Sequence, residues 1–176
     1  MQISQTAIDG VLIIKPRLFE DPRGYFFESY NQKEFNLAVN QDYHFVQDNQ
    51  SMSSQGTLRG IHFQTEPMAQ AKLVQVLEGE IYDVAVDLRK DSLTYCKWVS
   101  VKLSKSNQQQ LFIPEGFGHA FLTISSSANV MYKVNKYYSK EHEKAIRYDD
   151  PKLNIKWPLD NICLLYTSDA ADDTPC

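Results

Sequence analysis

The sequence predicts an all-β fold, a sandwich or a barrel of short strands with few helices. Apolar residues recur mostly at every second position, which is the period of a strand with one buried face. The candidate strands are short and follow one another closely along the chain. Helical signals are few, so strands are expected to build the core.

The strand expected over 98–104 shows the alternation most plainly, because Val99, Val101 and Leu103 share one face. The segment 80–89 differs, since it carries apolar side chains on both faces. In chain order, strands are expected at 10–15, 24–29, 44–49, 58–64, 71–77, 80–89, 98–104, 110–113, 119–124 and 129–137.

Two stretches carry helical signals. Residues 31–39 are expected to form a short helix with Asn31 as its N-cap, because the side chain of asparagine accepts a hydrogen bond from the first helical turn. Residues 138–144 are expected to contain one helical turn. No repeat, coiled-coil heptad or low-complexity linker interrupts the chain, so one domain is expected over residues 1–163.

The tail differs from the rest of the chain. Residues 164–176 (LLYTSDAADDTPC) show no packing pattern and end on a cysteine. Two interpretations stay open: a flexible terminus, or a non-native remnant of cloning or sequencing.

The composition argues against several classes of protein. The 18 Lys and Arg against 22 Asp and Glu give a net charge of −4, which disfavours a general nucleic-acid or anionic-membrane binder. The 3 cysteines lie far apart, so a disulfide framework and a cysteine zinc site are not expected. No signal-peptide pattern opens the chain, and no apolar run approaches the roughly 20 residues of a membrane span. We expect a cytoplasmic protein.

Several motifs with known chemistry are missing. The chain has no G-x-G-x-x-G after a strand, no G-x-x-x-x-G-K-[ST] and no G-x-S-x-G, so nicotinamide, P-loop and serine-hydrolase chemistry lack support. No two of the histidines stand at H-x-H or H-x-x-x-H spacing; they are His44, His62, His119 and His142. A metal site would need ligands from distant strands, so no metal is expected.

Three polar residues stand on strand faces that are expected to point inward. His62 lies in the apolar strand 58–64, Lys72 shares parity with Val74, and Tyr132 lies in the strand 129–137. Each has an ordinary interpretation: a core histidine bound to a carbonyl, a lysine that reaches water at a strand edge, a tyrosine packed in the core. Together they are the groups for proton abstraction next to a carbonyl, namely a base, an oxyanion stabiliser and an acid.

Six ordered blocks of sequence carry a family resemblance. They are FFESYN at 26–31, FVQDN at 45–49, LRGIHFQ at 58–64, AVDLR at 85–89, IPEGFGH at 113–119 and YYS at 137–139. In order and spacing they resemble the dTDP-4-dehydrorhamnose 3,5-epimerase family, and the resemblance extends from about residue 3 to Trp157-Pro158.

The resemblance implies a fold and a reaction. The fold is a cupin jelly roll, or double-stranded β-helix, assembled as a homodimer, with a pocket that works without metal or other cofactor. The reaction is epimerisation at C3 and C5 of dTDP-4-dehydro-6-deoxy-D-glucose, which gives dTDP-4-dehydro-L-rhamnose. By the same resemblance His62 is the general base, Lys72 stabilises the enolate oxygen at C4, and Tyr132 returns a proton from the opposite face.

The remaining family positions are implied to bind the sugar nucleotide. Arg23, Arg59 and His119 bind the diphosphate and the sugar, and Tyr138 stacks on the thymine ring. The residues implied to hydrogen-bond the nucleotide or sugar are Glu28, Gln47, Asn49 and Glu143.

One departure from the family pattern concerns the base. In the family, an aspartate in a Ser-x-Lys-Asp segment orients the catalytic histidine and favours its protonated form. Asp169 stands at that position, but Tyr166-Thr167-Ser168 precedes it and the lysine is absent. Asp83, on an inward face, is a second candidate partner for His62.

Three alternatives stay open. An epimerase that acts on one carbon would exchange one sugar hydrogen with solvent, whereas the double epimerase would exchange two. The second alternative is a cupin that binds a sugar nucleotide without catalysis, and the presence of His62, Lys72 and Tyr132 together argues against it. A metal-dependent cupin, such as a dioxygenase, would contain stoichiometric iron or zinc.

Overall fold

A computed structural model describes residues 1–165 of the chain. Its elements are, in chain order, β1 (Gln2–Gln5), β2 (Leu12–Lys15), β3 (Phe19–Asp21), β4 (Gly24–Phe26), α1 (Gln32–Val39), β5 (Gln47–Ser54), β6 (Thr57–Gln64), β7 (Lys72–Glu78), β8 (Glu80–Asp87), β9 (Trp98–Ser104), β10 (Gln110–Ile113), β11 (Phe117–Thr123), β12 (Ser127–Val134), β13 (Glu143–Ala145) and β14 (Cys163–Leu165). The all-β prediction is therefore confirmed.

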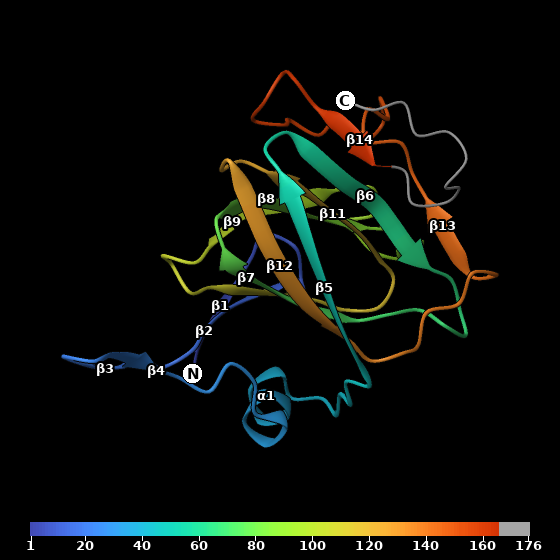
Figure 1. Cartoon of the computed structure of the whole chain (residues 1–176). Helices are drawn as coiled ribbons and strands as arrows, with labels where there is room; N and C mark the ends of the chain where they lie inside the picture. Colours follow the sequence, from blue (N-terminus) through green and yellow to red (C-terminus); the bar gives the residue numbers. More distant parts are fainter. Residues whose placement is uncertain (166–176) are drawn as a thin grey trace.

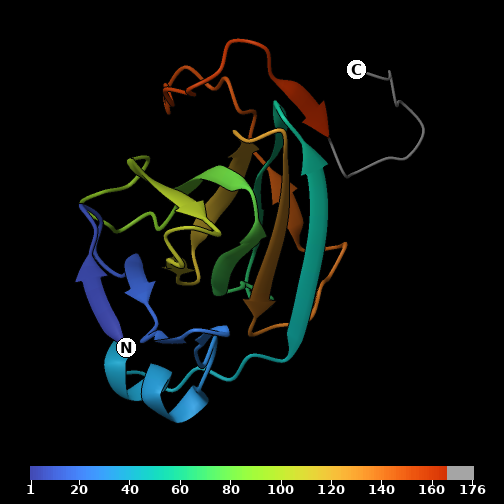
Figure 2. The ribbon, with the colours of Figure 1, turned by 60° about the vertical axis from the view of Figure 1, so that its left-hand side comes forward.

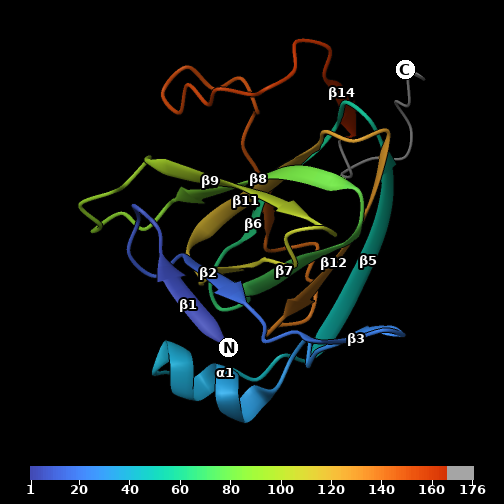
Figure 3. The same cartoon turned by 90° about the vertical axis from the view of Figure 1, so that its left-hand side faces the viewer.

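Two six-stranded sheets form the body of the molecule (Figure 1). One has the order β1-β2-β10-β7-β12-β5, and the other has the order β13-β6-β11-β8-β9 with β14 paired to β6. Every pairing is antiparallel except that of β14 with β6. Seen from the side, the two sheets wrap into a barrel, with β7, β12 and β5 facing β6, β11 and β8 (Figure 3).

The core explains why apolar and polar residues alternate along some strands and not along others. The largest apolar cluster draws residues from both sheets, among them Val74, Ile81 and Phe121, and so fills the space between them. A second cluster lies on the other face of β8 and β11, where Val84 packs with the segment 153–157. Both faces of β8 are therefore covered, as its sequence predicts.

Helix α1 packs outside the barrel, below β1 and β2 in Figure 1. Asn31 is its N-cap, because its side chain accepts a hydrogen bond from the N–H of Glu34. Phe35 is fully buried, and its ring lies 5.2 Å from that of Phe112 on β10. The expected helical turn after β12 is also present, since the carbonyl of Ser139 accepts hydrogen bonds from the N–H groups of the third and fourth residues after it.

Some strand predictions were wrong at their ends. β12 stops at Val134 rather than at 137, because the side chain of Asn135 turns the chain by accepting from the N–H of Ala71 and donating to Glu115. The predictions missed β1, β3, β13 and β14, which are only 3 or 4 residues long. Such short strands show no measurable alternation.

A two-stranded hairpin of β3 and β4 extends away from the barrel (Figures 1 and 3). Figure 2 shows helix α1 outside the barrel as well. We call residues 19–28 the arm. Its aromatic side chains are mostly in solvent, with Phe26 65% and Tyr25 51% exposed. The arm is thus an element whose apolar surface the described chain does not cover.

The predicted domain boundary at residue 163 stays a prediction, and β14 continues to Leu165. Among the helices of the described residues, none is long and apolar enough to cross a membrane.

Candidate active site

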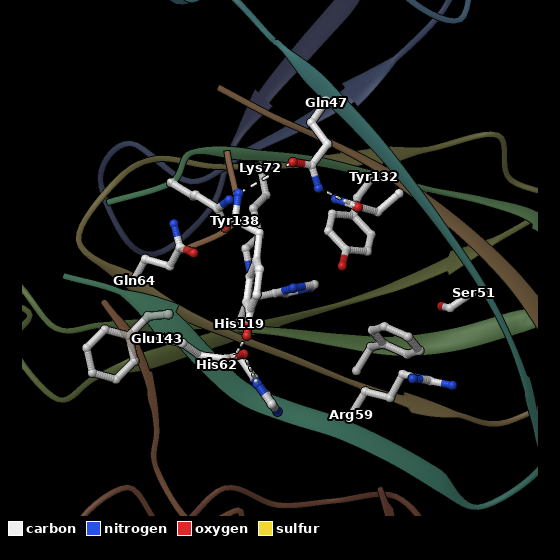
Figure 4. A pocket seen from close by; sticks show the side chains of 14 residues that line it. Gln47, Ser51, Arg59, His62, Gln64, Lys72, His119, Tyr132, Tyr138 and Glu143 are labelled. Carbon is white, nitrogen blue, oxygen red and sulfur yellow. Dashed lines mark hydrogen bonds and ion pairs between the residues drawn. The ribbon is translucent and has the colours of Figure 1, made fainter. Parts of the chain in front are cut away.

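A cavity of about 460 Å³ lies between the two sheets (Figure 4). This volume is in the range that holds small-molecule ligands. The walls come from β5, β7 and β12 of one sheet and from β6, β11 and β13 of the other. The lining residues are Gln47, Asn49, Ser51, Arg59, His62, Phe63, Gln64, Gln70, Lys72, His119, Phe121, Tyr132, Tyr138 and Glu143.

His62 reaches the cavity from β6. Its side chain is 20% exposed, and its Nδ1 lies 3.5 Å from Oε1 of Glu143 on β13. Burial lowers the pKa of His62, and the positive charge of Lys72 lowers it further, while the carboxylate of Glu143 opposes both. The ring is therefore biased toward its neutral form, which is the form that accepts a proton.

Lys72 begins β7 and points inward. It is only 8% exposed, and Val74 and Val76, which share its parity, are buried as well. Among residues 1–165 its Nζ has no hydrogen-bond partner, and it lies 5.9 Å from the centroid of the Tyr132 ring. Burial lowers the pKa of Lys72 to about 8. A desolvated ammonium group without a hydrogen bond is a strong attractor for negative charge that appears in the cavity.

Tyr132 comes from β12, where it pairs with Asn49 of β5 and Val74 of β7. Burial raises the pKa of its hydroxyl, which therefore holds its proton. In Figure 4 the hydroxyl points into the cavity, and the rings of Tyr132 and His62 lie on different sides of it.

His119 is paired with Asp83, which corrects one expectation. Nε2 of His119 lies 2.6 Å from Oδ1 of Asp83, and both residues are buried. Asp83 was a candidate partner for His62, but the strand register places it beside His119 instead. The carboxylate that the described chain brings to His62 is that of Glu143.

The predicted nucleotide-binding residues near the mouth of the cavity are linked to one another. The hydroxyl of Tyr138 donates to Oε2 of Glu143 at 2.8 Å, and the amide of Gln47 donates to Asn49 at 2.7 Å. Tyr138 is 55% exposed. It follows the end of β12, so it reaches the cavity from a loop and not by sharing a strand face with Tyr132.

Two predicted binding residues lie in the arm and not at the cavity. The guanidinium of Arg23 is 89% exposed and pairs with Asp21 at 2.6 Å. The carboxylate of Glu28 accepts a hydrogen bond from the side chain of Asn31. A third predicted residue, Asp169, lies outside the described residues, so its contact with His62 stays a prediction.

Comparison with known proteins identifies the family. The profile described as dTDP-4-dehydrorhamnose 3,5-epimerase matches residues 5–174. A Shigella flexneri protein of that name is 52% identical over 161 residues, which is 92% of this chain and 89% of the relative. The chain belongs to the dTDP-4-dehydrorhamnose 3,5-epimerase family.

Solved structures of the family have the same fold. The enzyme from Elizabethkingia anophelis superposes with a TM-score of 0.91 at 44% identity, over 94% of this chain and 91% of that one. A dTDP-6-deoxy-D-glucose-3,5-epimerase from Legionella pneumophila, in complex with dTDP-4-keto-L-rhamnose, superposes with a TM-score of 0.90 at 45% identity, over 93% and 87% of the two chains. The predicted cupin jelly roll is confirmed.

The family motifs located most of the cavity but missed five of its residues. Ser51, Gln64 and Phe121 follow at intervals of two from predicted residues on β5, β6 and β11, so strand parity alone was a sufficient signal for them. Phe63 and Gln70 have no such signal.

Among residues 1–165, no group of three or more histidine, cysteine or acidic side chains is placed to hold a metal ion. The metal-free mechanism expected for the family remains a prediction for this chain.

Proposed function

We propose that the chain catalyses epimerisation at C3 and C5 of dTDP-4-dehydro-6-deoxy-D-glucose through an enolate. The observation that carries this proposal is one cavity in which His62 and Tyr132 lie on different sides. Lys72 is buried beside them, and its Nζ has no hydrogen-bond partner within residues 1–165. An acid and a base on different sides are what inversion at carbon requires, because a single group that removed and returned the proton would tend to restore the original configuration.

The first step is proton abstraction by His62. The C4 ketone acidifies the hydrogens on C3 and C5, and the neutral imidazole takes one of them as a proton. The electron pair of the broken C–H bond moves into the new C=C bond of the enolate, and the C4 oxygen gains the negative charge. Lys72 stabilises that oxygen, and a donor in this role is worth about 10²- to 10³-fold in rate.

The second step is protonation by Tyr132. The enolate carbon takes the phenolic proton from the face opposite His62, and the C=O bond of the ketone is restored. The raised pKa of Tyr132 keeps this proton in place at neutral pH until the carbanion-like carbon accepts it. Proton exchange with water then resets both side chains for the next carbon.

We propose that the nucleotide part of the substrate lies toward Tyr138. Its exposed ring offers a stacking surface for thymine, and the amides of Gln47 and Asn49 offer donors and acceptors beside it. Arg59 supplies positive charge for the diphosphate, and His119 offers a ring nitrogen to the sugar. The ligand in the Legionella structure, dTDP-4-keto-L-rhamnose, is of this chemical class.

We further propose a homodimer. Arg23 and Glu28 are binding residues in the family, yet in this chain they lie in the arm and not at the cavity. An arm that carries exposed aromatic rings and an exposed arginine is suited to pack on a second copy and to complete its site. A cytoplasmic location stays a prediction.

The test is incubation with the 4-keto sugar nucleotide in heavy water, followed by proton NMR. Deuterium at both C3 and C5, with formation of the L-rhamno product, is the expected result. Deuterium at one carbon would assign a single-carbon epimerase. No exchange, with dTDP still bound, would overturn the proposal in favour of a binding protein without catalysis.

A further inference from the structure

Asp83 is a buried carboxylate that the proposed mechanism does not use. It is 0% exposed, and it lies on β8 but is not one of the residues that line the cavity. One of its oxygens contacts His119, and the other, Oδ2, is buried with no hydrogen-bond partner among the described residues. A carboxylate is costly to bury with an oxygen unsatisfied, so packing alone does not account for it.

The contact between Asp83 and His119 fixes the imidazole. Because the carboxylate accepts the proton on Nε2, at a distance of 2.6 Å, the tautomer and the plane of the ring are set. The nitrogen left for a ligand is Nδ1, which has no hydrogen-bond partner among residues 1–165. Because His119 lines the cavity, its contact with Asp83 determines which ring nitrogen a ligand in the cavity can meet.

The charge of Asp83 also acts on Lys72. Burial lowers the pKa of Lys72, and Asp83 is the largest of the influences that raise it, ahead of Glu143. Lys72 needs its positive charge to stabilise an enolate, and it has no direct ion pair in the described chain. The fixed negative charge of Asp83 therefore favours the ammonium form of Lys72 without forming a direct ion pair with it.

We propose that Asp83 is a positioning residue that acts on the cavity through His119, whose ring it orients, and through Lys72, whose charge it supports. The inference rests on the proposed epimerase function. Asp83 touches no substrate, and a fully apolar replacement of similar size would remove both effects at once.

Other charged groups surround the same space, and any pH profile reflects them together. The titratable and charged groups that face Lys72 and His119 are Arg59 and His62 on β6, Asp83 on β8, Tyr132 on β12, Glu143 on β13 and Tyr138 in the loop before it. Glu143 is the other carboxylate, but it bonds Tyr138 and lies near His62. Asp83 is thus the carboxylate that pairs with His119.

The experiment compares Asp83→Asn with the unaltered chain, using the 4-keto sugar nucleotide as substrate. We expect kcat to fall about 100-fold, because Lys72 loses the charge that supports its ammonium form and the ring of His119 loses its fixed orientation. KM and the Kd for dTDP should change less than about threefold. The alkaline limb of kcat/KM should move to lower pH by about one unit, since Lys72 loses its largest supporting charge.

Asp87→Asn is the matched control. Asp87 is also fully buried on β8, but it bonds Arg89, Ser92 and Thr94 away from the cavity. Its replacement should lower thermal stability and leave the alkaline limb where it was. A folded Asp83→Asn enzyme with kcat within about threefold of the unaltered chain, or with an unmoved alkaline limb, would overturn the inference.

A measurement on the unaltered chain covers the case in which Asp83→Asn does not fold. Nitrogen-15 NMR of the histidine rings should place the proton of neutral His119 on Nε2, and a proton on Nδ1 would contradict the inference. This result is independent of turnover. If the unaltered chain exchanges no sugar hydrogen in heavy water, the proposed function fails, whereas failure of the Asp83 variant alone to change kcat leaves that function intact.

Discussion

The cavity and the arm place predicted site residues in opposite environments. In the cavity, His62, Lys72 and Tyr132 are held by strands of both sheets and are largely withdrawn from water. In the arm, Arg23 is exposed to solvent on a hairpin that pairs with no other strand of the described chain. Groups that must carry shifted pKa values need the first environment, and groups that only have to reach a charged ligand can work from the second.

This difference predicts that substitutions in the two regions change different kinetic constants. Changes in the cavity should act on kcat, because they alter the stabilisation of charge in the transition state. Changes in the arm should act on KM, because they alter binding of parts of the substrate that do not react. The predictions below test this division.

The largest effect is expected from His62→Asn. Loss of the base should lower kcat by about 10³-fold or more, with the Kd for dTDP changed less than about threefold. Turnover and dTDP titration of the purified variant give both numbers. His44→Asn is the control, because His44 is exposed and its ring contacts the side chain of Gln32 on α1, away from the cavity residues. Activity retained in the His62 variant would show that the base is another residue.

The next effect is expected from Lys72→Met, which keeps the length of the side chain and removes its charge. We expect kcat to fall about 10²- to 10³-fold, since the C4 oxygen loses its positive partner. Lys102→Met should have no effect on kcat, because Lys102 is an exposed lysine that pairs with Glu80 on the neighbouring strand. If KM rises while kcat stays, Lys72 binds substrate without stabilising the enolate.

The pH dependence follows from the same two residues. His62 must be neutral to accept a proton, and burial lowers its pKa, so activity should fall only as the pH drops through that lowered pKa. Lys72 must be charged, and its pKa of about 8 makes activity fall as the pH rises through that value. A plot of kcat/KM against pH should therefore be bell-shaped, with slopes approaching about tenfold per unit outside the window. A profile that stays level above pH 9 would contradict the role of Lys72.

The arm is tested by Arg23→Ala. We expect KM to rise about tenfold with kcat nearly unchanged, which corresponds to the loss of one charge-assisted hydrogen bond to the diphosphate. Arg147→Ala is a close control, because Arg147 is also exposed and also pairs with an aspartate two residues away.

A mixture of Arg23→Ala and His62→Asn chains tests the proposed dimer. If each arm completes its partner's site, mixed dimers regain one site with both native residues.

The sequence predicted the cavity better than it predicted how the site is connected. Strand parity placed Lys72 and Tyr132 inward, and the family motifs located His62 and His119, because these signals are local to one strand. The partner of Asp83 could not be predicted in the same way. It depends on the register between β8 and β11, which is set by packing between strands that are far apart in the sequence.

The position of Arg23 and Glu28 shows another limit. The motif that contains Glu28 marks it as a binding residue, but a motif does not say whether the residue reaches the cavity of its own chain. That question depends on where the arm packs. In the sequence, the aromatic residues of the arm are apolar residues in a short strand, and core residues show the same pattern. The sequence therefore does not reveal that these side chains are exposed.

Tyr138 lies between the two regions, and the loss of its hydroxyl should have the smallest effect. Tyr138→Phe removes the hydroxyl that donates to Glu143 and keeps the ring, so KM should change less than about threefold. Tyr138→Ala removes the ring as well, and KM should rise about tenfold, the usual value of one stacked base. Steady-state kinetics of the pair separate the two contributions. If the phenylalanine variant is as impaired as the alanine variant, Tyr138 acts through its hydrogen bond to Glu143, and the mouth of the cavity belongs to the catalytic region rather than to the binding region.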